Sequence, residues 1–470
     1  MTIESDLSPA RANWPGWVLL GTMLLCASLA MRWSSGQFGH QAELPDMPIL
    51  TLVGAYCGAG AVIFVCLPRL IRSAGPYASV GLIAFMVIAG LVMRLVQFGA
   101  EPVLEDDHNR YLWDGAVTAA GANPYAASPE GSHGLSDLKA RAGVVFERIN
   151  YPEYRTVYPP LAQAAFVISH WVAPFSLDGW RGLLMVLELA SLGLIMAILQ
   201  RLSQPVLWAG LYWWNPVAIK EIANSAHVEP VLVLPVLLGV YLVLAGRPVW
   251  STAMLAIAAG VKIWPALLAL PVLRQLLNRP ARLAAAMTVG GMILAAQAWP
   301  ILAAGIGDDS GFVAYAQKWR ASSAALLASD WLTSAIGIAS AARGLLALML
   351  VLAIAVICRS RAAGEPAVVF RLFLISAAVC LLSPSMFPWY FLWVLPFLCF
   401  YPVRGLLLLG VLMPFHYLYF HFAARDLEHI YNQGIVWLIW LPVWVVLAYD
   451  TGRALAGRRT SGLIDHAART

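Results

Sequence analysis

The sequence predicts an all-α, polytopic membrane protein, and three observations predict it. Hydrophobic residues make up 60% of the 470 residues and charged residues only 12%, which is more apolar than a soluble core of this length can hide. The apolar residues gather in runs near the ~20 residues that a helix needs to cross a bilayer. The polar segments between these runs are mostly short. We therefore expect residues 1–470 to form one integral membrane domain.

The candidate spans account for most of the chain. About fourteen runs approach the required length, and their ranges are 14–31, 47–68, 77–98, 158–175, 180–200, 205–220, 227–245, 250–273, 282–304, 342–358, 367–383, 387–401, 404–420 and 434–450. The first run lacks an Ala-x-Ala cleavage pattern, so we expect a retained helix rather than a signal peptide.

Arginines indicate how these helices are oriented. If the amino terminus is cytoplasmic, alternation places nearly all arginine-rich connections inside, as the positive-inside rule requires. They contain Arg69, Arg72, Arg274, Arg279, Arg282, Arg359, Arg361, Arg453, Arg458 and Arg459. The same alternation puts the polar segments 99–157, 305–333 and 421–433 on the outer face. We therefore predict a multi-pass protein of the cell inner (plasma) membrane. A net charge of only +5 favours membrane lipids as surroundings and no nucleic-acid partner.

The segment 99–157 is too long for a passive connection in a compact bundle. Its aromatic side chains argue against disorder, because disordered segments are poor in aromatics. They are Tyr111, Trp113, Tyr125, Phe146, Tyr151, Tyr154 and Tyr158. The stretch RYLWDGAVTAAG carries apolar residues near helical spacing and ends at Gly121, which predicts an amphipathic helix lying on the membrane surface.

Three consecutive acids, Glu105, Asp106 and Asp107, stand just before this helix. One aspartate could simply cap the helix, since negative side chains are favoured there. Capping needs only one acid, however, and crowded carboxylates raise one pKa toward the working range of a general base. We interpret Asp107 and Asp106 as candidate catalytic residues, with capping as the alternative.

Two cations lie within apolar runs, where a charge is costly and indicates a site by default. Lys262 stands midway along AAGVKIWPALLAL, and a phosphate held between helices is an obvious anion for it. Arg94 lies near the outer end of the third span and could equally extend its charged end to the interface.

The segment 215–229 is the densest polar intrusion, with Asn215, Lys220, Glu221, Asn224, His227 and Glu229. Alternation places it at a cytoplasmic turn, far from Asp107, where paired charges would make an ordinary inner loop. A functional interpretation requires a broken helix lining a wet cavity, which the Asn215–Pro216 step would allow. Both interpretations stay open.

Aromatic and histidine side chains near the carboxyl end form a last group of candidates. Tyr390, in SPSMFPWYFLWVLPF, suits an interfacial belt as well as a sugar-stacking surface. His416 and His421 lie toward the predicted outer face without HExxH-type spacing, and the six cysteines form no CxxC pair. We therefore predict no metal motif.

The string DDHNRYLWDGAVTAAGANPYAASP, residues 106–129, resembles a segment of polyprenyl-phosphate-sugar-dependent glycosyltransferases of the GT-C fold. It is most similar to the bacterial mannosyltransferase branch of lipomannan and phosphatidylinositol-mannoside enzymes. The blocks YPPLAQ, WNP, SAHVE and KIWP look like further parts of that branch.

The resemblance implies a sugar donor on a lipid phosphate, delivered outside the cytoplasm, and a lipid or glycan hydroxyl as acceptor. It implies that Asp107 is the base with Asp106 as its neighbour, and that Arg110 helps to orient the donor phosphate. Together with the two cations in apolar runs, this gives Arg110, Lys262 and Arg94 as the candidate residues that bind the donor phosphate. Further residues that could contact substrate are Tyr111, Tyr158, Glu221, His227, Glu229, Tyr390 and His416. Some relatives are regarded as metal-assisted through Asp-x-Asp, but the aspartates here are adjacent. We therefore assign no cofactor and leave a divalent cation open.

The resemblance also divides the chain. A GT-C module would occupy 77–304 and include the loop 99–157, with two additional helices in 1–76 and the second outer loop and further helices in 305–470. The rival from another class is a transporter or lipid flippase, in which the intramembrane charges line a pathway. We detect no internal repeat of the kind that many transporters show.

Overall fold

The computed structural model describes residues 13–75, 78–360 and 362–467. This described part is helical and contains no β-strand. Among the described residues, eight helices are long and apolar enough to cross a membrane, and four shorter apolar helices accompany them. The chain is thus a membrane-embedded, all-helical protein, whereas the predicted count of about fourteen spans is not confirmed.

The helices of the bundle have the following bounds: α1 (Trp14–Ser34), α2 (Ile49–Ala74), α3 (Val80–Leu95), α8 (Leu177–Arg201), α11 (Glu229–Leu244), α12 (Pro248–Ala258), α13 (Ala269–Arg274), α14 (Pro280–Ala303), α17 (Ala342–Arg359), α18 (Glu365–Leu382), α20 (Arg404–Leu412), α21 (Leu418–Ala423) and α23 (Val436–Ala467). In the polar segments or directly next to them lie α4 (Asp107–Ala119), α5 (Ser136–Ala142), α6 (Val144–Glu147), α7 (Pro160–Val172), α15 (Gly311–Lys318), α16 (Ala324–Ala335) and α22 (Glu428–Ile430).

Short helical turns complete the chain: η1 (Ser35–Phe38), η2 (Leu44–Asp46), η3 (His133–Leu135), η4 (Val206–Ala209), α9 (Gly210–Trp213), α10 (Pro216–Ala218), η5 (Ile219–Asn224), η6 (Trp264–Leu268), η7 (Ala339–Ala341), η8 (Pro388–Trp393), α19 (Leu395–Leu398), η9 (Met413–Tyr417) and η10 (Tyr431–Ile435). The predicted boundary at residues 76 and 77 lies outside the described residues, as do Arg361 and the side chains of Arg458 and Arg459.

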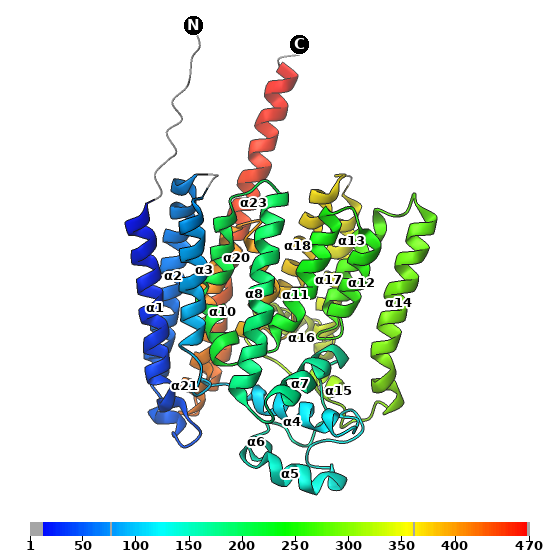
Figure 1. Cartoon of the computed structure of the whole chain (residues 1–470). Helices are drawn as coiled ribbons and strands as arrows, with labels where there is room; N and C mark the ends of the chain where they lie inside the picture. The colour runs from blue at the N-terminus through cyan, green and yellow to red at the C-terminus, as the bar shows by residue number, and fades with distance from the viewer. Residues whose placement is uncertain (1–12, 76–77, 361, 468–470) are drawn as a thin grey trace.

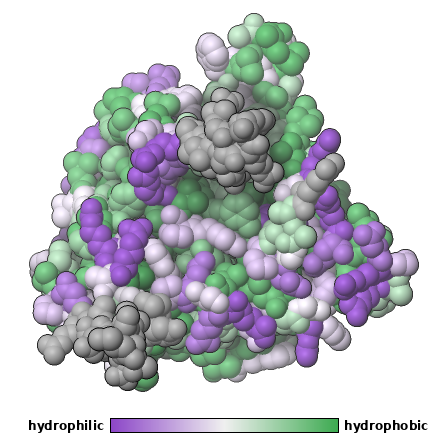
Figure 2. All heavy atoms as spheres, turned by 90° about the horizontal axis from the view of Figure 1, so that it is seen from above, coloured by the Kyte–Doolittle hydropathy of each residue, from purple (hydrophilic) through white to green (hydrophobic). Residues whose placement is uncertain are grey.

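The polar loop 99–157 gathers at one end of the bundle, while α1 begins and α23 ends at the other (Figure 1). The second polar segment joins this loop, because Arg155 pairs with Asp309 at 2.6 Å. The rings of Tyr151 and Trp319 add a contact with centroids 4.8 Å apart. The predicted outer segments 99–157 and 305–333 therefore share one face, which we call the loop face. The opposite end carries hydrophilic side chains among hydrophobic ones (Figure 2).

Residues 158–175, predicted to be a span, do not form one. They contain α7, whose 13 residues reach about 20 Å, short of the ~30 Å hydrocarbon core. α7 packs against α4 at the loop face (Figure 1). The next helix, α8, is the one that runs from the loop face to the opposite end. Ser176 caps its start, since the hydroxyl accepts from Gly179 N at 3.0 Å.

Residues 206–244 then enter and leave the bundle from the same end. At the far end of α8, Arg201 donates to the carbonyl of Leu244, the last residue of α11, at 3.3 Å. Near the start of α8, by contrast, Arg181 donates to the carbonyl of Asn224. The chain therefore turns back at 225–228, inside the bundle and next to the loop face, and we call 206–244 the re-entrant hairpin.

This hairpin corrects the predicted position of 215–229 at a cytoplasmic turn, far from Asp107. The predicted orientation was wrong because α7 was counted as a membrane crossing. That extra crossing reversed the predicted directions of α8 and of the re-entrant hairpin. The Asn215–Pro216 break predicted for the functional interpretation is present: the Asn215 side chain accepts from Val217 N at 2.9 Å and starts α10.

The helix predicted after the acidic run is confirmed as α4, but it does not lie on a surface. All residues from Asn109 to Val117 are buried. Gly115 allows α7 to approach, because a Cβ there would stand 2.5 Å from the carbonyl oxygen of Phe166. Asp106 occupies the N-cap position without a side-chain capping bond, so capping does not account for the acids.

Candidate active site

A cavity of about 1100 Å³ opens beside the start of α4. Glu105, Asp106 and Asp107 line one part of it. The part contributed by α17 and α18 is mainly apolar, with Leu346, Ala347, Leu350, Val379 and Leu382. Cationic side chains also line the cavity, namely Arg110, Arg148, Arg155, Lys262 and Arg343. The cavity therefore combines acids, cations and an apolar wall.

Asp107 is the first residue of α4, and its carboxylate receives three hydrogen bonds. Tyr111 and Tyr158 donate their hydroxyls to Oδ2, each at 3.3 Å. Asn150 donates its amide to Oδ1 at 3.1 Å. A carboxylate offers about four lone-pair sites, so one remains for a ligand in the cavity. The predicted residues Asp107, Tyr111 and Tyr158 thus lie together.

Asp106 accepts a hydrogen bond from the same Asn150 amide, whose Nδ2 lies 2.7 Å from Asp106 Oδ1. Desolvation at the cavity raises the pKa of Asp106 to about 7, and the negative charges of Asp107 and Glu105 add to this effect. The predicted pKa rise from crowding thus falls on Asp106.

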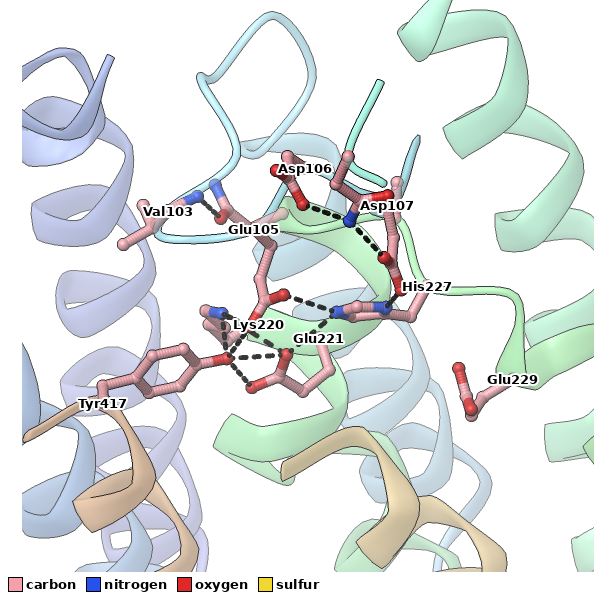
Figure 3. Close-up of polar contacts among 12 residues, drawn as sticks. Val103, Glu105, Asp106, Asp107, Lys220, Glu221, His227, Glu229 and Tyr417 are labelled. Atoms are coloured by element: carbon pink, nitrogen blue, oxygen red, sulfur yellow. Dashed lines mark hydrogen bonds and ion pairs between the residues drawn. The ribbon is translucent and has the colours of Figure 1, made fainter. Parts of the chain in front are cut away.

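Behind the aspartates lies a buried cluster of Glu105, Lys220, Glu221 and Tyr417 (Figure 3). The Tyr417 hydroxyl contacts Glu105 and Glu221 at 2.9 Å each. The ammonium of Lys220 lies 3.3 Å from Glu221 and 3.8 Å from Glu105 and also contacts the Tyr417 hydroxyl. Tyr56, from α2, donates to Glu221 at 3.3 Å. The re-entrant hairpin thus delivers its charges to the site, contrary to the inner-loop interpretation.

His227 joins this cluster to the proposed base. Its Nδ1 lies 3.7 Å from Asp107, and its Nε2 lies 3.6 Å from both Glu105 and Glu221. The imidazole stacks on Trp389 with centroids 3.8 Å apart. The ring is therefore held in one plane between carboxylates.

The backbone is strained beside three of these residues. Leu104 precedes Glu105 with φ +58°, and Ala226 precedes His227 with φ +62°. Tyr151, next to Asn150, has φ +47°. Such conformations cost about 1–3 kcal/mol in non-glycine residues and gather at functional sites. The η5 segment, which lies just before the turn at 225–228, is a π-helix. Short π-helices are also frequent at functional sites.

Two of the predicted phosphate-binding cations line the cavity. Arg110 donates to Asp114 at 2.9 Å and to the carbonyl of Tyr154 at 3.0 Å, and its Nη2 has no hydrogen-bond partner among the described residues. Lys262 pairs with Glu229 at 3.0 Å and lies 4.2 Å above the ring of Tyr390. Glu229 and Tyr390 therefore surround Lys262, and Glu229 stands apart from the acidic cluster (Figure 3).

The structure corrects the predicted surroundings of Arg94. Its side chain is 1% exposed, forms two 2.8 Å bonds to the fully buried Glu188, and stacks 3.7 Å from the ring of Trp213. Arg94 lies neither in the cavity lining nor at an interface. The buried ion pair with Glu188 therefore contradicts the predicted extension to the interface, while phosphate binding by Arg94 stays a prediction. Glu188 within a predicted span was the overlooked partner.

His416 does not line the cavity either. Its Nδ1 lies 2.7 Å from the hydroxyl of Ser322, so it joins the second polar segment to η9. Sequence reasoning missed Asn150, Tyr417 and Tyr56, because no motif surrounds them and each belongs to a different part of the chain.

Three side chains bring metal-ligand atoms close together. Those of Glu105, Glu221 and His227 lie within 4.8 Å of one another. The Lys220 ammonium already supplies positive charge beside both carboxylates, so we assign no metal site to these residues.

Comparison with known proteins adds one finding. No curated protein and no solved structure matches the chain. Residues 156–384, which include the re-entrant hairpin and much of the cavity wall, match the family model for Glycosyltransferase family 87, and this match supports a glycosyltransferase role for the chain.

Proposed function

We propose that the protein transfers a sugar from a polyprenyl-phosphate donor to a hydroxyl of a lipid or glycan acceptor, with Asp107 as general base. The acceptor O–H gives its proton to the Asp107 carboxylate while its oxygen bonds to the anomeric carbon. The bond from that carbon to the phosphate oxygen breaks, and the lipid phosphate leaves with the electron pair. A single displacement of this kind inverts the anomeric centre.

The observation that carries the proposal is the placement of Asp107 in a cavity that also holds cations and an apolar wall. Arg110 and Lys262 could stabilise the leaving phosphate. The apolar side chains of α17 and α18 offer a surface for a polyprenyl chain. A sugar activated by a nucleotide would need no such wall. Mannose is the sugar that the sequence resemblance favours.

The rival function, transport, is less well supported by these contacts. A pathway needs its charges exposed to a cavity, but Lys220, Glu221, His227 and Glu229 are fully buried and absent from the cavity lining. They pair with one another and with Lys262 instead. This arrangement suits a fixed site better than an ion pathway.

Asp107→Asn tests the proposal. A strain that lacks the gene is complemented with wild type, with Asp107→Asn, or with Asp137→Asn, a matched change at an exposed acid on α5. Mass spectrometry compares lipid-linked and surface glycans, and purified protein gives the rate of sugar transfer. We expect a loss of about 10²–10⁴-fold for Asp107→Asn only, with donor binding retained. Unchanged transfer would refute the assignment of the base.

We further propose that the loop face lies outside the cytoplasm. Ala140→Cys on exposed α5, in a background without the exposed Cys26, should react with a membrane-impermeant thiol reagent on intact cells. Reaction only after the cells are lysed would place the site inside.

A further inference from the structure

His227 is buried at the tip of the re-entrant hairpin among more negative than positive charges. Its two ring nitrogens face three carboxylates, those of Asp107, Glu105 and Glu221, at 3.6–3.7 Å. Nε2 is fully buried and has no hydrogen-bond partner among the described residues. A neutral imidazole has only one N–H, so it would turn a lone pair toward a carboxylate on one side.

The other groups near the ring leave this imbalance in place. Lys220 is the cation beside Glu105 and Glu221. Tyr111 places its hydroxyl 3.5 Å from Nδ1, and Tyr417 contacts the two glutamates behind Nε2. His108 is neutral, because burial and then the charge of Arg181 lower its pKa to about 3. Three carboxylates thus face one ammonium.

Trp389 adds a contact that favours positive charge on the ring. The indole lies parallel to the imidazole within 17°, with centroids 3.8 Å apart. The face of an aromatic ring attracts a cation, and the attraction is strongest for tryptophan. The stack also fixes the plane of the imidazole, so that each nitrogen keeps its carboxylate.

We propose that His227 is a positioning residue that works as an imidazolium, with Nδ1–H directed at Asp107 and Nε2–H at Glu105 and Glu221. The role in catalysis rests on the proposed function, in which Asp107 is the base. The imidazolium offsets the negative charge that Asp106 and Glu105 place beside the Asp107 carboxylate. It also fixes the orientation of Asp107 toward the cavity. Proton removal from the acceptor therefore continues at a lower pH than three adjacent acids would otherwise allow.

The first test examines the charge of His227 without any activity assay. Full-length protein with ¹⁵N-labelled histidine is placed in lipid nanodiscs, and its imidazole nitrogens are followed by NMR as the pH rises. His227→Gln identifies the signal, and His227→Asn serves as a second assignment variant. His133, which lies on the exposed part of the loop, is the internal reference. We expect both His227 nitrogens to remain protonated about one pH unit or more above 6.5, the usual histidine pKa.

A His227 signal from a single-tautomer neutral ring near pH 7 would overturn the proposal. So would the loss of a ring N–H proton from His227 on adding Mg²⁺ alone, because a nitrogen that binds a metal carries no proton. Either outcome leaves the proposed transferase reaction untouched.

The second test uses the transfer rate. His227→Gln keeps a polar side chain but removes the charge, so the acid limb of kcat/KM should move to higher pH by about one unit or more. The rate should recover in part at high pH. An equal loss at every pH would indicate a merely structural role and overturn the proposal. Absence of transfer by the wild type would instead refute the proposed function.

Discussion

Replacing Asn150 with alanine removes the amide that joins the two aspartates. Its Nδ2 lies 2.7 Å from Asp106 and 3.1 Å from Asp107. A hydrogen bond donated to a carboxylate favours the charged form, and Asn150 lowers the pKa of Asp106, which burial holds at about 7. Without the amide, Asp106 accepts a proton more readily. The acid limb of the pH–rate profile should therefore move to higher pH.

The size of this shift follows from the two bonds. A hydrogen bond to a charged group contributes about 1.5–3 kcal/mol, and one pH unit corresponds to about 1.4 kcal/mol. The acid limb should thus move by about one to two units. On that limb, Asn150→Ala should reduce kcat/KM about 10–100-fold, and the loss should shrink at high pH.

The assay is kcat/KM for sugar transfer measured from about pH 5 to about pH 9, a range that brackets the titration of the acids. Asn123→Ala is the matched control, because Asn123 is exposed on the same loop and donates to Pro300. An acid limb that stays in place would refute the reasoning. A loss of the same size at every pH would do so too, since it would indicate a role in folding or substrate contact.

Three further outcomes are expected. Arg94→Met should lower the free energy of unfolding by about 3–5 kcal/mol, measured in detergent, because it leaves the buried carboxylate of Glu188 without its partner. Tyr158→Phe should reduce transfer about tenfold with little change in stability, because the proposed base loses one hydroxyl donor. Gly115→Ala should destabilise the protein and slow transfer, because its Cβ would clash with the carbonyl of Phe166; the thermal midpoint is the measurement.

Controls separate these effects from general damage. Gly182→Ala changes a glycine of α8 whose surroundings are open, so stability should hardly change. If Arg94→Met were fully stable but bound donor weakly, Arg94 would be a phosphate ligand after all. If Tyr158→Phe transferred sugar normally, its hydroxyl would not assist the base.

The sequence was sufficient for the local features of the site. The three adjacent acids indicated where the candidate catalytic residues lie. The apolar residues at helical spacing after them, ending at Gly121, predicted the helix that the structure shows as α4. These features depend on neighbours within a few residues, so a single sequence contains them. The sequence also predicted that segments 99–157 and 305–333 share one face. Alternation placed both on the same side, because it counted an even number of membrane crossings between them.

The position of the re-entrant hairpin did not follow from the sequence. Hydropathy cannot distinguish the 13 residues of α7, buried against other protein, from a helix buried in lipid. That one error placed His227 at the wrong end of the bundle. Likewise, the sequence alone shows only a cation in an apolar run at Arg94, which indicates a site by default. The structure shows that Glu188 of α8 is its partner.

The contact between Tyr56 and Glu221 bears on how short the protein can be made. The first two helices come before the predicted GT-C module, so one would expect the protein to work without them. Yet α2 contributes a hydroxyl to the innermost carboxylate of the site, and Arg32 at the end of α1 donates to the carbonyl of Gly99 at 2.7 Å. A version truncated to the predicted module would open the buried charges to lipid. We therefore expect the smallest functional form of the protein to include both of these helices.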